Sequence, residues 1–355
     1  MSVVARVTLQ TVADKVGVSR MTVSNAFSRP DQLSAGLRQK VLDAAQELGY
    51  AGPDPAARAL ARGTSGAVGV LLTSSLPYAF TDDVAIRFLG AVSQELSSTG
   101  LALTLLTTDS RNDVLPARDV AMDGALVYSC TPSTESLDWL VKRNITLVFV
   151  DQDPRDDVAS VNVDDRGGAR AAAEHLVDLG HRRIAVMSAG MGGQHGLVTD
   201  LRSAAAGWTR VARERALGYL DALTSAGIEP ISHRQVENND EEARAAARLL
   251  LSGEERPTGV LCYSDVLARG VILAAEDLGL SVPNDISVIG FDDSAVAGTS
   301  RPPLTTVRQD VLAKGAAAAA ALIAAMDAHR AGRPIEPAHV VLPTELVVRE
   351  SAGPA

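Results

Sequence analysis

Several kinds of residue are scarce in this 355-residue chain, and each scarcity excludes a class of protein. Cysteine occurs only at Cys130 and Cys262, so we expect neither a disulfide framework nor a cysteine metal cluster. Aromatic residues make up 3% of the chain, so its cores must consist of Ala, Val and Leu. The N-terminus lacks the basic and apolar segments of a secretory signal, and no window reaches the roughly 18 apolar residues of a membrane span. We therefore expect a soluble cytoplasmic protein with no membrane partner.

Residue patterns typical of enzymes are also missing. His175 and His181 share no helical face, and no cluster of histidine and carboxylate residues has the spacing of a metal site. The glycine-rich run at 190–196 follows an apolar segment, but His195 occupies the place of the third glycine of a dinucleotide fingerprint. No nucleophile elbow and no histidine-paired cysteine is recognisable. We expect no metal, no cofactor and no catalytic residue.

Charge is divided unevenly along the chain. Residues 1–63 contain eight Lys or Arg and five Asp or Glu, which leaves 25 basic and 38 acidic residues in the remainder. The first segment thus has a net charge of +3 and the rest −13. This asymmetry indicates a basic head that approaches a polyanion and an acidic body that avoids it, although chance variation of a solvated surface is an open alternative.

The first fifty residues are predicted to form three short helices. Thr8, Ser19 and Ser34 stand where helix N-caps are expected, and apolar residues follow each of them at helical spacing. Gly17 supplies a tight turn between the first two helices. This arrangement predicts a helix-turn-helix, whose second helix enters the DNA major groove.

The second of these helices, in S-R-M-T-V-S-N-A-F, directs Arg20, Met21 and Asn25 away from the core. Arginine can donate two hydrogen bonds to guanine, asparagine can pair with adenine, and methionine can touch a thymine methyl group. We expect these three residues to contact bases, although ordinary exposed polar positions are the alternative. Hydroxyl groups near helix starts suit phosphate contacts. The expected phosphate contacts are Thr8, Ser19, Thr22, Ser24 and Ser34.

The N-terminal sixty residues resemble the LacI/GalR family of bacterial transcription regulators. The resemblance is carried by T-L-Q-T-V-A-D-K-V-G-V-S-R-M-T-V-S-N-A-F, L-S-A-G-L-R-Q-K-V-L-D-A-A-Q-E-L-G-Y and A-R-A-L-A-R-G. It implies that the last piece is a hinge helix that pairs with its dimer mate in the minor groove. Ala57, Arg58 and Leu60 would lie there, with Leu60 wedged into a central base step. The family's common Pro-Asn is replaced by Gly-Pro-Asp-Pro at 52–55, which predicts a hinge start offset by one residue.

From residue 67 onwards, apolar strand-like runs alternate with helices, which predicts parallel sheets covered on both faces. D-D-R-G-G-A-R, D-I-S-V-I-G-F-D-D and P-P-L-T-T-V-R-Q-D resemble the family's effector domain, which shares its fold with periplasmic sugar-binding proteins. The expected fold is an all-α helix-turn-helix head on a two-lobed α/β body with two Rossmann-like sheets. The expected domains are the head at 1–50, the hinge at 51–65 and the effector-binding and dimerisation domain at 66–355. Within the last of these, we expect lobe 1 at about 66–162 and 293–325 and lobe 2 at about 163–292 and 326–350.

Ligands of such folds bind beyond the carboxyl ends of the strands, between the lobes. Asp151, Asp292 and the pair Ser264-Asp265 end strand-like runs, and the resemblance assigns a ligand-gripping role to Arg213 and a pocket position to Gln309. Carboxylates, an arginine and amides suit a polyol, whose hydroxyls both donate and accept. Helix capping or surface ion pairing is the alternative for each. Two aromatic residues after the first strand suit either an apolar wall of the site or the core: Tyr78 and Phe80.

Residues 190–209 form an insertion relative to the family pattern and carry His195 and Trp208. The insertion could be a lid or a specificity element. The chain as a whole is expected to be a repressor that binds operator double-stranded DNA as a homodimer and responds to a sugar-like effector. A sugar-transport solute-binding protein is the alternative, disfavoured by the basic head and the missing secretory signal. An enzyme is the third possibility.

Overall fold

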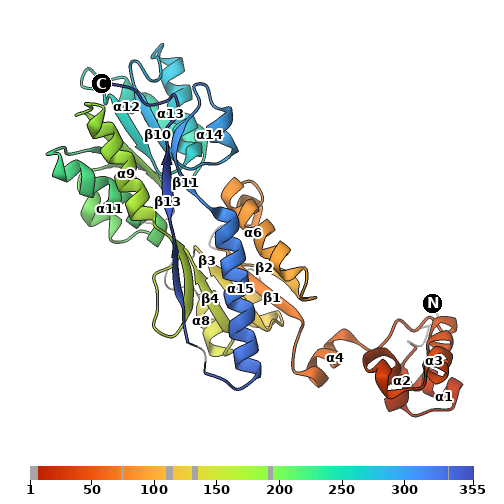
Figure 1. The fold of residues 1–355 in the computed structure, drawn as a ribbon. Helices are drawn as coiled ribbons and strands as arrows, with labels where there is room; N and C mark the ends of the chain where they lie inside the picture. The colour runs from red at the N-terminus through yellow and green to blue at the C-terminus, as the bar shows by residue number, and fades with distance from the viewer. Residues whose placement is uncertain (1–6, 73–75, 109–114, 130–134, 191–194, 335) are drawn as a thin grey trace. The chain divides into compact units, whose positions relative to one another are not determined.

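The computed structural model describes residues 7–72, 76–108, 115–129, 135–190, 195–334 and 336–355, so Cys130 lies outside the described residues. The chain forms two compact units, Met1–Gly66 and Ala67–Ala355, which we call the head and the body. Their boundary falls one residue after the end of the expected hinge. The described part of the head contains helices and no strand, and the body combines helices with two sheets (Figure 1).

The three expected helices of the head are confirmed. They are α1 (Leu9–Val16), α2 (Arg20–Ser28) and α3 (Ala35–Glu47), with a short 3₁₀ turn η1 (Pro30–Gln32) before α3 and the helix α4 (Pro55–Arg62) after it. Each of the first three begins at an expected cap, because the side chains of Thr8, Ser19 and Ser34 accept hydrogen bonds from backbone N–H groups of the first turn. Gly17 ends α1 with a φ of 76°, a conformation that glycine adopts readily.

A small core holds the head together. Its centre is built from alanine and valine, and Phe27 meets Tyr50 edge to face at the rim, with ring centroids 5.8 Å apart. The buried members are Val12, Ala13, Val23, Ala26, Val41, Ala44 and Ala45. Because these residues belong to α1, α2 and α3, their burial fixes the face of α2 that remains outside.

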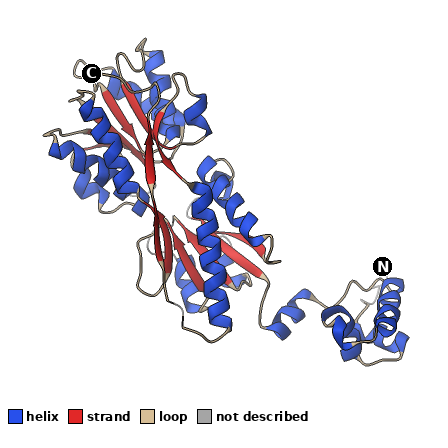
Figure 2. Ribbon diagram, viewed as in Figure 1, coloured by secondary structure: helices blue, strands red, loops and turns tan. Residues whose placement is uncertain are grey.

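The first lobe of the body contains a parallel sheet of six strands in the order β12-β5-β4-β3-β1-β2. Helices α6 and α15 cover one face, and α7 and α8 cover the other (Figure 2). The strands are β1 (Ala67–Leu72), β2 (Ala102–Thr107), β3 (Gly124–Tyr128), β4 (Thr146–Val150), β5 (Ala159–Val163) and β12 (His339–Leu342). The helices are α5 (Leu76–Ala79), α6 (Asp83–Leu96), α7 (Pro116–Asp119), α8 (Glu135–Lys142) and α15 (Val311–Arg330).

The second lobe contains a seven-stranded sheet in the order β13-β11-β10-β9-β6-β8-β7, in which the two edge strands run antiparallel to their neighbours. Helices α9 and α11 cover one face, and α12 and α13 cover the other. The strands are β6 (Ile184–Ala189), β7 (Gly196–Val198), β8 (Ile231–Gln235), β9 (Gly259–Cys262), β10 (Ser287–Asp292), β11 (Thr305–Gln309) and β13 (Thr344–Val347). The helices are α9 (Asp165–Asp178), α10 (Leu201–Ala205), α11 (Arg210–Ser225), α12 (Asp240–Leu251), α13 (Asp265–Asp277) and α14 (Ala295–Thr299).

The chain passes between the lobes after β5, after β11 and after β12. Two expected lobe boundaries are therefore corrected. β11 falls within the range expected for lobe 1, 293–325, but lies in the second sheet, where it pairs with β10 and β13. β12 falls within the range expected for lobe 2, 326–350, but pairs with β5 in the first sheet. Because β5 and β11 both end at a crossing, the carboxyl ends of the parallel strands in both sheets lie at the junction of the lobes.

Two segments depart from simple sequence expectation. Contrary to the expected absence of such a window, α15 is long and apolar enough to cross a membrane by length and composition alone. Its residues Ala318, Ala319 and Leu322 are buried against the first sheet, as in the core helix of a globular domain. The insertion at 190–209 contributes the edge strand β7 and the short helix α10, which packs against α11.

Candidate functional site

In the head, the residues expected to read bases lie on the outer face of α2. Arg20 is exposed and Met21 is 69% exposed at the start of the helix, whereas Val23 and Ala26 on the opposite side are fully buried. Asn25 is half-buried, and its Nδ2 donates a hydrogen bond to Oε1 of Gln32 at 3.1 Å. The structure therefore presents the three side chains on one accessible surface, with the amide of Asn25 held in a defined orientation.

The hydroxyl residues expected to contact phosphate have local partners as well. Ser19 Oγ accepts from the backbone N–H of Thr22 at 3.0 Å and lies 2.9 Å from Thr22 Oγ1. Thr8 and Ser34 act as N-caps in the same way, and Ser24 is half-buried within α2. A hydroxyl that accepts one hydrogen bond retains its proton for donation, so capping is compatible with a phosphate contact.

The expected hinge helix is present as α4 and begins at Pro55, consistent with the offset start. Arg58 Nη2 donates to the carbonyl oxygen of Pro53 at 3.0 Å. Ala57 and Arg58 are exposed, and Leu60 is 87% exposed. Leu60 is thus exposed to solvent rather than buried in the head.

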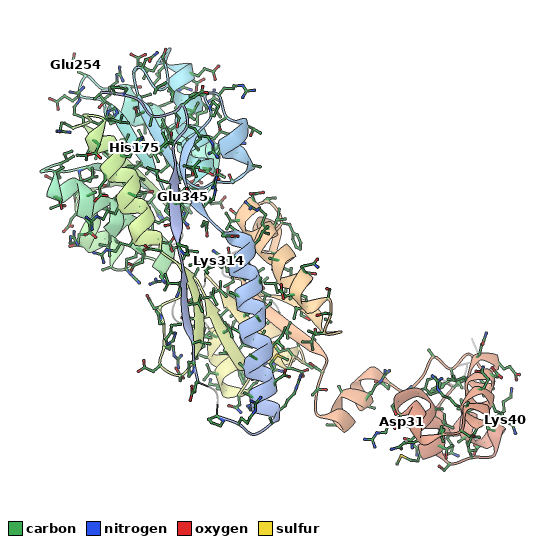
Figure 3. The ribbon with its side chains drawn as sticks, viewed as in Figure 1. Asp31, Lys40, His175, Glu254, Lys314 and Glu345 are labelled. Carbon is green, nitrogen blue, oxygen red and sulfur yellow. The ribbon has the colours of Figure 1, made fainter. Side chains whose placement is uncertain are left out.

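In the body, a continuous series of buried polar contacts lies at the junction of the lobes. It begins at Asp151, directly after β4, whose Oδ2 accepts from Lys314 Nζ at 2.7 Å. Lys314, in the first turn of α15 (Figure 3), also donates to Gln309 Oε1 at 2.9 Å. Gln309 Nε2 in turn donates to Asp292 Oδ1 at 2.7 Å. The series therefore passes from the last residue of β11 to the last residue of β10.

Arg215 on α11 continues the series within the second lobe. Its Nη1 lies 3.1 Å from Asp292 Oδ1, and its Nε donates to Asp165 Oδ1 at 2.8 Å. Nη1 also donates to the carbonyl oxygen of Tyr263 at 2.6 Å, and the guanidinium carbon lies 3.6 Å from the ring centroid of Phe291. We call the complete set the polar network; it comprises Asp151, Lys314, Gln309, Asp292, Arg215 and Asp165.

Burial and neighbouring charges shift the pKa values of ionisable side chains in the polar network. Burial raises the pKa of Asp292 to about 6 despite the opposing charge of Arg215, and burial likewise raises the pKa of Asp165. Burial disfavours the charge of Arg215, but Asp292 and Asp165 outweigh this effect and raise its pKa. Asp151 Oδ1 and Asp165 Oδ2 are buried without a partner among the described residues. Buried acceptors of this kind are normally satisfied, so these two oxygens can take donors that the described chain does not supply.

The structure places Arg213 and Arg215, both on α11, in different surroundings. Arg213, expected to grip the ligand, is outside the polar network and pairs instead with Asp153, through Nη2–Oδ1 and Nη1–Oδ2 distances of 2.5 and 3.2 Å. Arg215 takes the central place and was missed. Helical phase is the signal that could have identified it, because Arg215 shares the inward face of α11 with Ala212 and Tyr219.

Lys314 was also missed, although it interrupts an otherwise apolar run in V-L-A-K-G-A-A-A-A-A. A lysine at the start of an apolar helix is a candidate for a buried, paired cation, and Lys314 is 1% exposed. Asp151 and Asp292, which the strand ends predict, and Gln309, which the family resemblance implies, do come together here.

The other expected ligand residues are less suited to that role. Both oxygens of Asp265 accept hydrogen bonds from the protein, Oδ1 from Thr306 Oγ1 and Oδ2 from the Ser294 N–H. Burial and the charge of Asp292 raise the pKa of Asp265 to about 8. Ser264 caps α13. Phe80 is 62% exposed, and the side chain of Tyr78 in α5 lies outside the described residues. The contacts of Ser264 and Asp265 within the protein favour the structural alternative for these two residues, and the exposure of Phe80 does not fit the alternative of a core position.

A separate pocket of about 590 Å³ lies on the second lobe and shares no lining residue with the polar network. Its walls include residues of α10, the end of α11 and the start of β8. Among the described residues, no group of three or more His, Cys, Asp or Glu could hold a metal ion. The polar network is therefore the candidate site of the body.

Comparison with known proteins agrees with this two-part organisation. Residues 8–52 match the bacterial regulatory proteins of the lacI family, and residues 173–352 match the periplasmic binding protein-like domain. An HTH-type transcriptional regulator of Mycolicibacterium smegmatis is 37% identical over 370 residues, which cover 98% of this chain and 97% of that protein. The HTH-type transcriptional regulator IpsA of Corynebacterium glutamicum is 37% identical over 330 residues, covering 90% and 91% of the two chains.

Solved structures show the same architecture. The lac repressor dimer bound to operator and the anti-inducer ONPF is 26% identical, with a TM-score of 0.76 over 98% of this chain and 99% of that one. The transcriptional regulator CelR in complex with cellobiose is 28% identical, with a TM-score of 0.69 over 98% and 100% of the two chains. The helix-turn-helix head, the two-lobed body and the relatives that span nearly the whole chain lead to one conclusion: the protein belongs to the lacI family of bacterial transcriptional regulators.

Proposed function

We propose that this regulator is a cytoplasmic repressor that binds a palindromic operator as a homodimer and is controlled by a sugar or related polyol held between its lobes. The relatives support the repressor role, the dimer on an operator and the sugar ligand. The lac repressor was solved as a dimer on its operator, CelR was solved with cellobiose, and several relatives are named transcriptional repressors. The ligand is bound and released unchanged, without catalysis.

The single observation that carries the ligand assignment is the polar network with its two unpartnered carboxylate oxygens. Asp151 Oδ1 and Asp165 Oδ2 can only accept hydrogen bonds when ionised, so they select a ligand with hydroxyl donors. Arg215 and Lys314 hold these carboxylates in place and limit the accumulated negative charge. The partly exposed ring of Tyr263 beside Arg215 adds an aromatic surface for the apolar face of a sugar ring, whereas Phe291 is buried beneath Arg215 and supports the guanidinium.

Control of DNA binding requires that the ligand distinguishes two arrangements of the lobes. The polar network draws residues from both lobes, with Asp151 and Lys314 in the first and Asp292, Arg215 and Asp165 in the second. A ligand that bridges these groups stabilises one degree of closure, and the closure is transmitted to the hinge segments that precede β1. Operator affinity then changes through a shift between states rather than through competition for DNA.

On the DNA, we propose that Arg20, Met21 and Asn25 contact bases while the hydroxyls at the helix starts contact phosphates. The phosphate set is Thr8, Ser19, Thr22, Ser24 and Ser34. The exposed side chain of Leu60 enters the minor groove from the hinge, flanked by Ala57 and Arg58.

The test combines two measurements on the full chain. Binding to DNA from around its own gene should weaken steeply as salt rises, because each phosphate contact releases counterions. Absence of any binding at low salt would contradict the regulatory function. A thermal-shift screen of sugars and cyclic polyols identifies the ligand, since only a compound that favours the folded state raises the melting temperature. An effective compound should also change operator affinity, and sedimentation should show a dimer.

A further inference from the structure

The second lobe contains a buried cation that the polar network does not use. Arg215, Lys314 and Arg234 are the cationic side chains in the body that are at least nine-tenths buried among the described residues. Arg215 and Lys314 are each paired with carboxylates, whereas Arg234, which is 1% exposed, has no carboxylate partner in the described part of the chain. An unpaired buried charge is costly, so such residues normally have a partner.

The contacts of Arg234 leave part of its guanidinium unused. Nε and Nη2 both donate to the carbonyl oxygen of Gly190, at 3.3 and 3.0 Å, and the guanidinium carbon lies 4.1 Å from the ring centroid of Trp208. Nη1 is buried and has no hydrogen-bond partner among the described residues. Gly190 has a φ of 145°, and a Cβ there would lie 2.9 Å from Nη2, so this close approach depends on glycine.

Neighbouring donors are also unsatisfied. Trp208 Nε1 and Arg210 Nε are buried without a partner in the described structure. Trp208 directly precedes Thr209, the N-cap of the 16-residue helix α11, and the Thr209 side chain makes no capping hydrogen bond. The backbone N–H groups in the first turn of α11 therefore add to the same surplus of donors, and a helix N-terminus favours negative charge.

This donor cluster adjoins the polar network. Trp208, which contacts the Arg234 guanidinium, belongs to the hydrophobic cluster against which Tyr263 packs, and Arg215 lies 4.9 Å from the Tyr263 ring centroid. Arg210 and Arg213 in the first turn of α11 already share the carboxylate of Asp153. Arg234 is consequently the cation beside the network that still lacks a negative partner.

We propose that Arg234, Trp208 and the N-terminus of α11 form an anion-binding subsite, and that the effector is a polyol carrying a phosphate or carboxylate group. This inference rests on the proposed function, in which the hydroxyls of the same ligand meet the polar network. It also gives the insertion at 190–209 a role, since Gly190 and Trp208 at its two ends hold the guanidinium of Arg234. The anion supplies the acceptors that the unpartnered donors lack.

Thermal melts of the full chain test the proposal with matched compounds. The panel contains hexoses, pentoses and cyclic polyols, each with its phosphate monoester and its sugar acid, together with inorganic phosphate alone. We expect one anionic compound to bind at least about tenfold more tightly than its neutral parent, since hydrogen bonds between charged groups are stronger than those between neutral groups. The phosphate and carboxylate arms of the panel distinguish the two anions.

The variant Arg234→Met should abolish this preference for the anion and leave the affinity for the neutral parent unchanged. Without ligand, it should melt at the same or a higher temperature than the unsubstituted protein, because an unpaired buried charge has been removed. Arg202→Met, which changes an exposed arginine of the same lobe, is the matched control and should behave as the parent. Should Arg234→Met fail to fold, Arg234→Lys retains the charge without the planar fork and should lose most of the preference.

The proposal is overturned if no anionic compound exceeds its neutral parent, or if Arg234→Met keeps the difference. If neutral sugars alone raise the melting temperature and release the operator, the anion subsite fails while the proposed function stands. If no compound acts but salt-dependent operator binding persists, both the subsite and the polyol effector are rejected and only the DNA-binding function remains.

Discussion

Arg213 on α11 of the second lobe forms a two-pronged ion pair with Asp153, which follows β4 in the first lobe. Arg210, one turn earlier, lies 3.7 Å from the same carboxylate. The pair therefore links the lobes directly beside the polar network, and any change in lobe closure must alter it.

A double-mutant cycle on Asp153→Ala and Arg213→Ala should give a coupling free energy of about 0.2–1 kcal/mol, because both side chains are partly exposed and screened. Each single variant should retain operator binding and shift the ligand concentration for half-maximal response. Urea unfolding and operator-binding titrations measure the two effects. Identical ligand responses in all four proteins would show that the pair does not influence closure.

Arg215→Ala should destabilise the body by about 3–5 kcal/mol, because it leaves Asp165 and Asp292 buried without their cation. Arg213→Ala, two residues away on the more exposed side of the helix, should lower the free energy of unfolding by less than about 1 kcal/mol. Urea denaturation of the two variants provides the comparison. Equal losses would contradict the assignment of Arg215 as the centre of the network.

Asp265 predicts a pH dependence of stability. Its pKa is raised from the ordinary carboxyl value of 3.8 to about 8 by burial and by the charge of Asp292, so the folded state retains the proton longer than the unfolded chain. This contribution to stability is complete below about pH 4 and is lost as pH rises towards 8.

Asp265→Asn removes that titration and can still accept from the Ser294 N–H and donate to Thr306 Oγ1. We expect the free energy of unfolding of the variant to decline less than that of the parent between pH 6 and 8. This window is chosen because Asp292, with a pKa of about 6, contributes to the pH dependence mainly below it. Urea unfolding series at several pH values measure the slopes. Parallel curves for the two proteins would rule out a protonated Asp265 in the native state.

In the head, Arg20→Ala and Asn25→Ala should each relax preference at particular operator base pairs, at a cost of about 1–3 kcal/mol on the best site. Gln32→Ala should weaken the Asn25-dependent preference alone, because Gln32 orients the Asn25 amide. Thr22→Ala should lower affinity for all sequences alike. Binding selections on randomised operators separate these patterns, and a uniform loss for Asn25→Ala would contradict base reading.

Leu60→Ala should lower operator affinity by about 1–2 kcal/mol, roughly tenfold in Kd, through loss of buried apolar surface on DNA. The stability of the free protein should change by less than about 0.5 kcal/mol, since Leu60 is 87% exposed. Operator titration and thermal melting of the same preparation measure both. A loss of stability without a loss of affinity would mean that Leu60 packs on the protein instead.

Local sequence patterns were sufficient to predict the helices of the head and the alternation of strands and helices in the body. The caps at Thr8, Ser19 and Ser34 and the turn at Gly17 depend on hydrogen bonds within a few residues, so sequence alone predicts where the helices begin. The strand ends also located Asp151 and Asp292, because parallel strands bring their carboxyl ends to one edge of a sheet, and the family resemblance located Gln309.

Tertiary structure decided which charged side chains meet. Residues Arg213 and Arg215 are nearly equivalent in sequence, and only the packing of α11 against α9 and the sheet buries one of them. Lys314 lies 163 residues from Asp151, and β12 joins the first sheet only through its pairing with β5. Local periodicity encodes which face of an element is apolar, but the partner of a buried charge depends on how distant elements pack. The amino-acid sequence by itself therefore determined the elements and the family. The tertiary structure determined the lobe boundaries, the polar network and the burial of Arg234 without a carboxylate partner among the described residues.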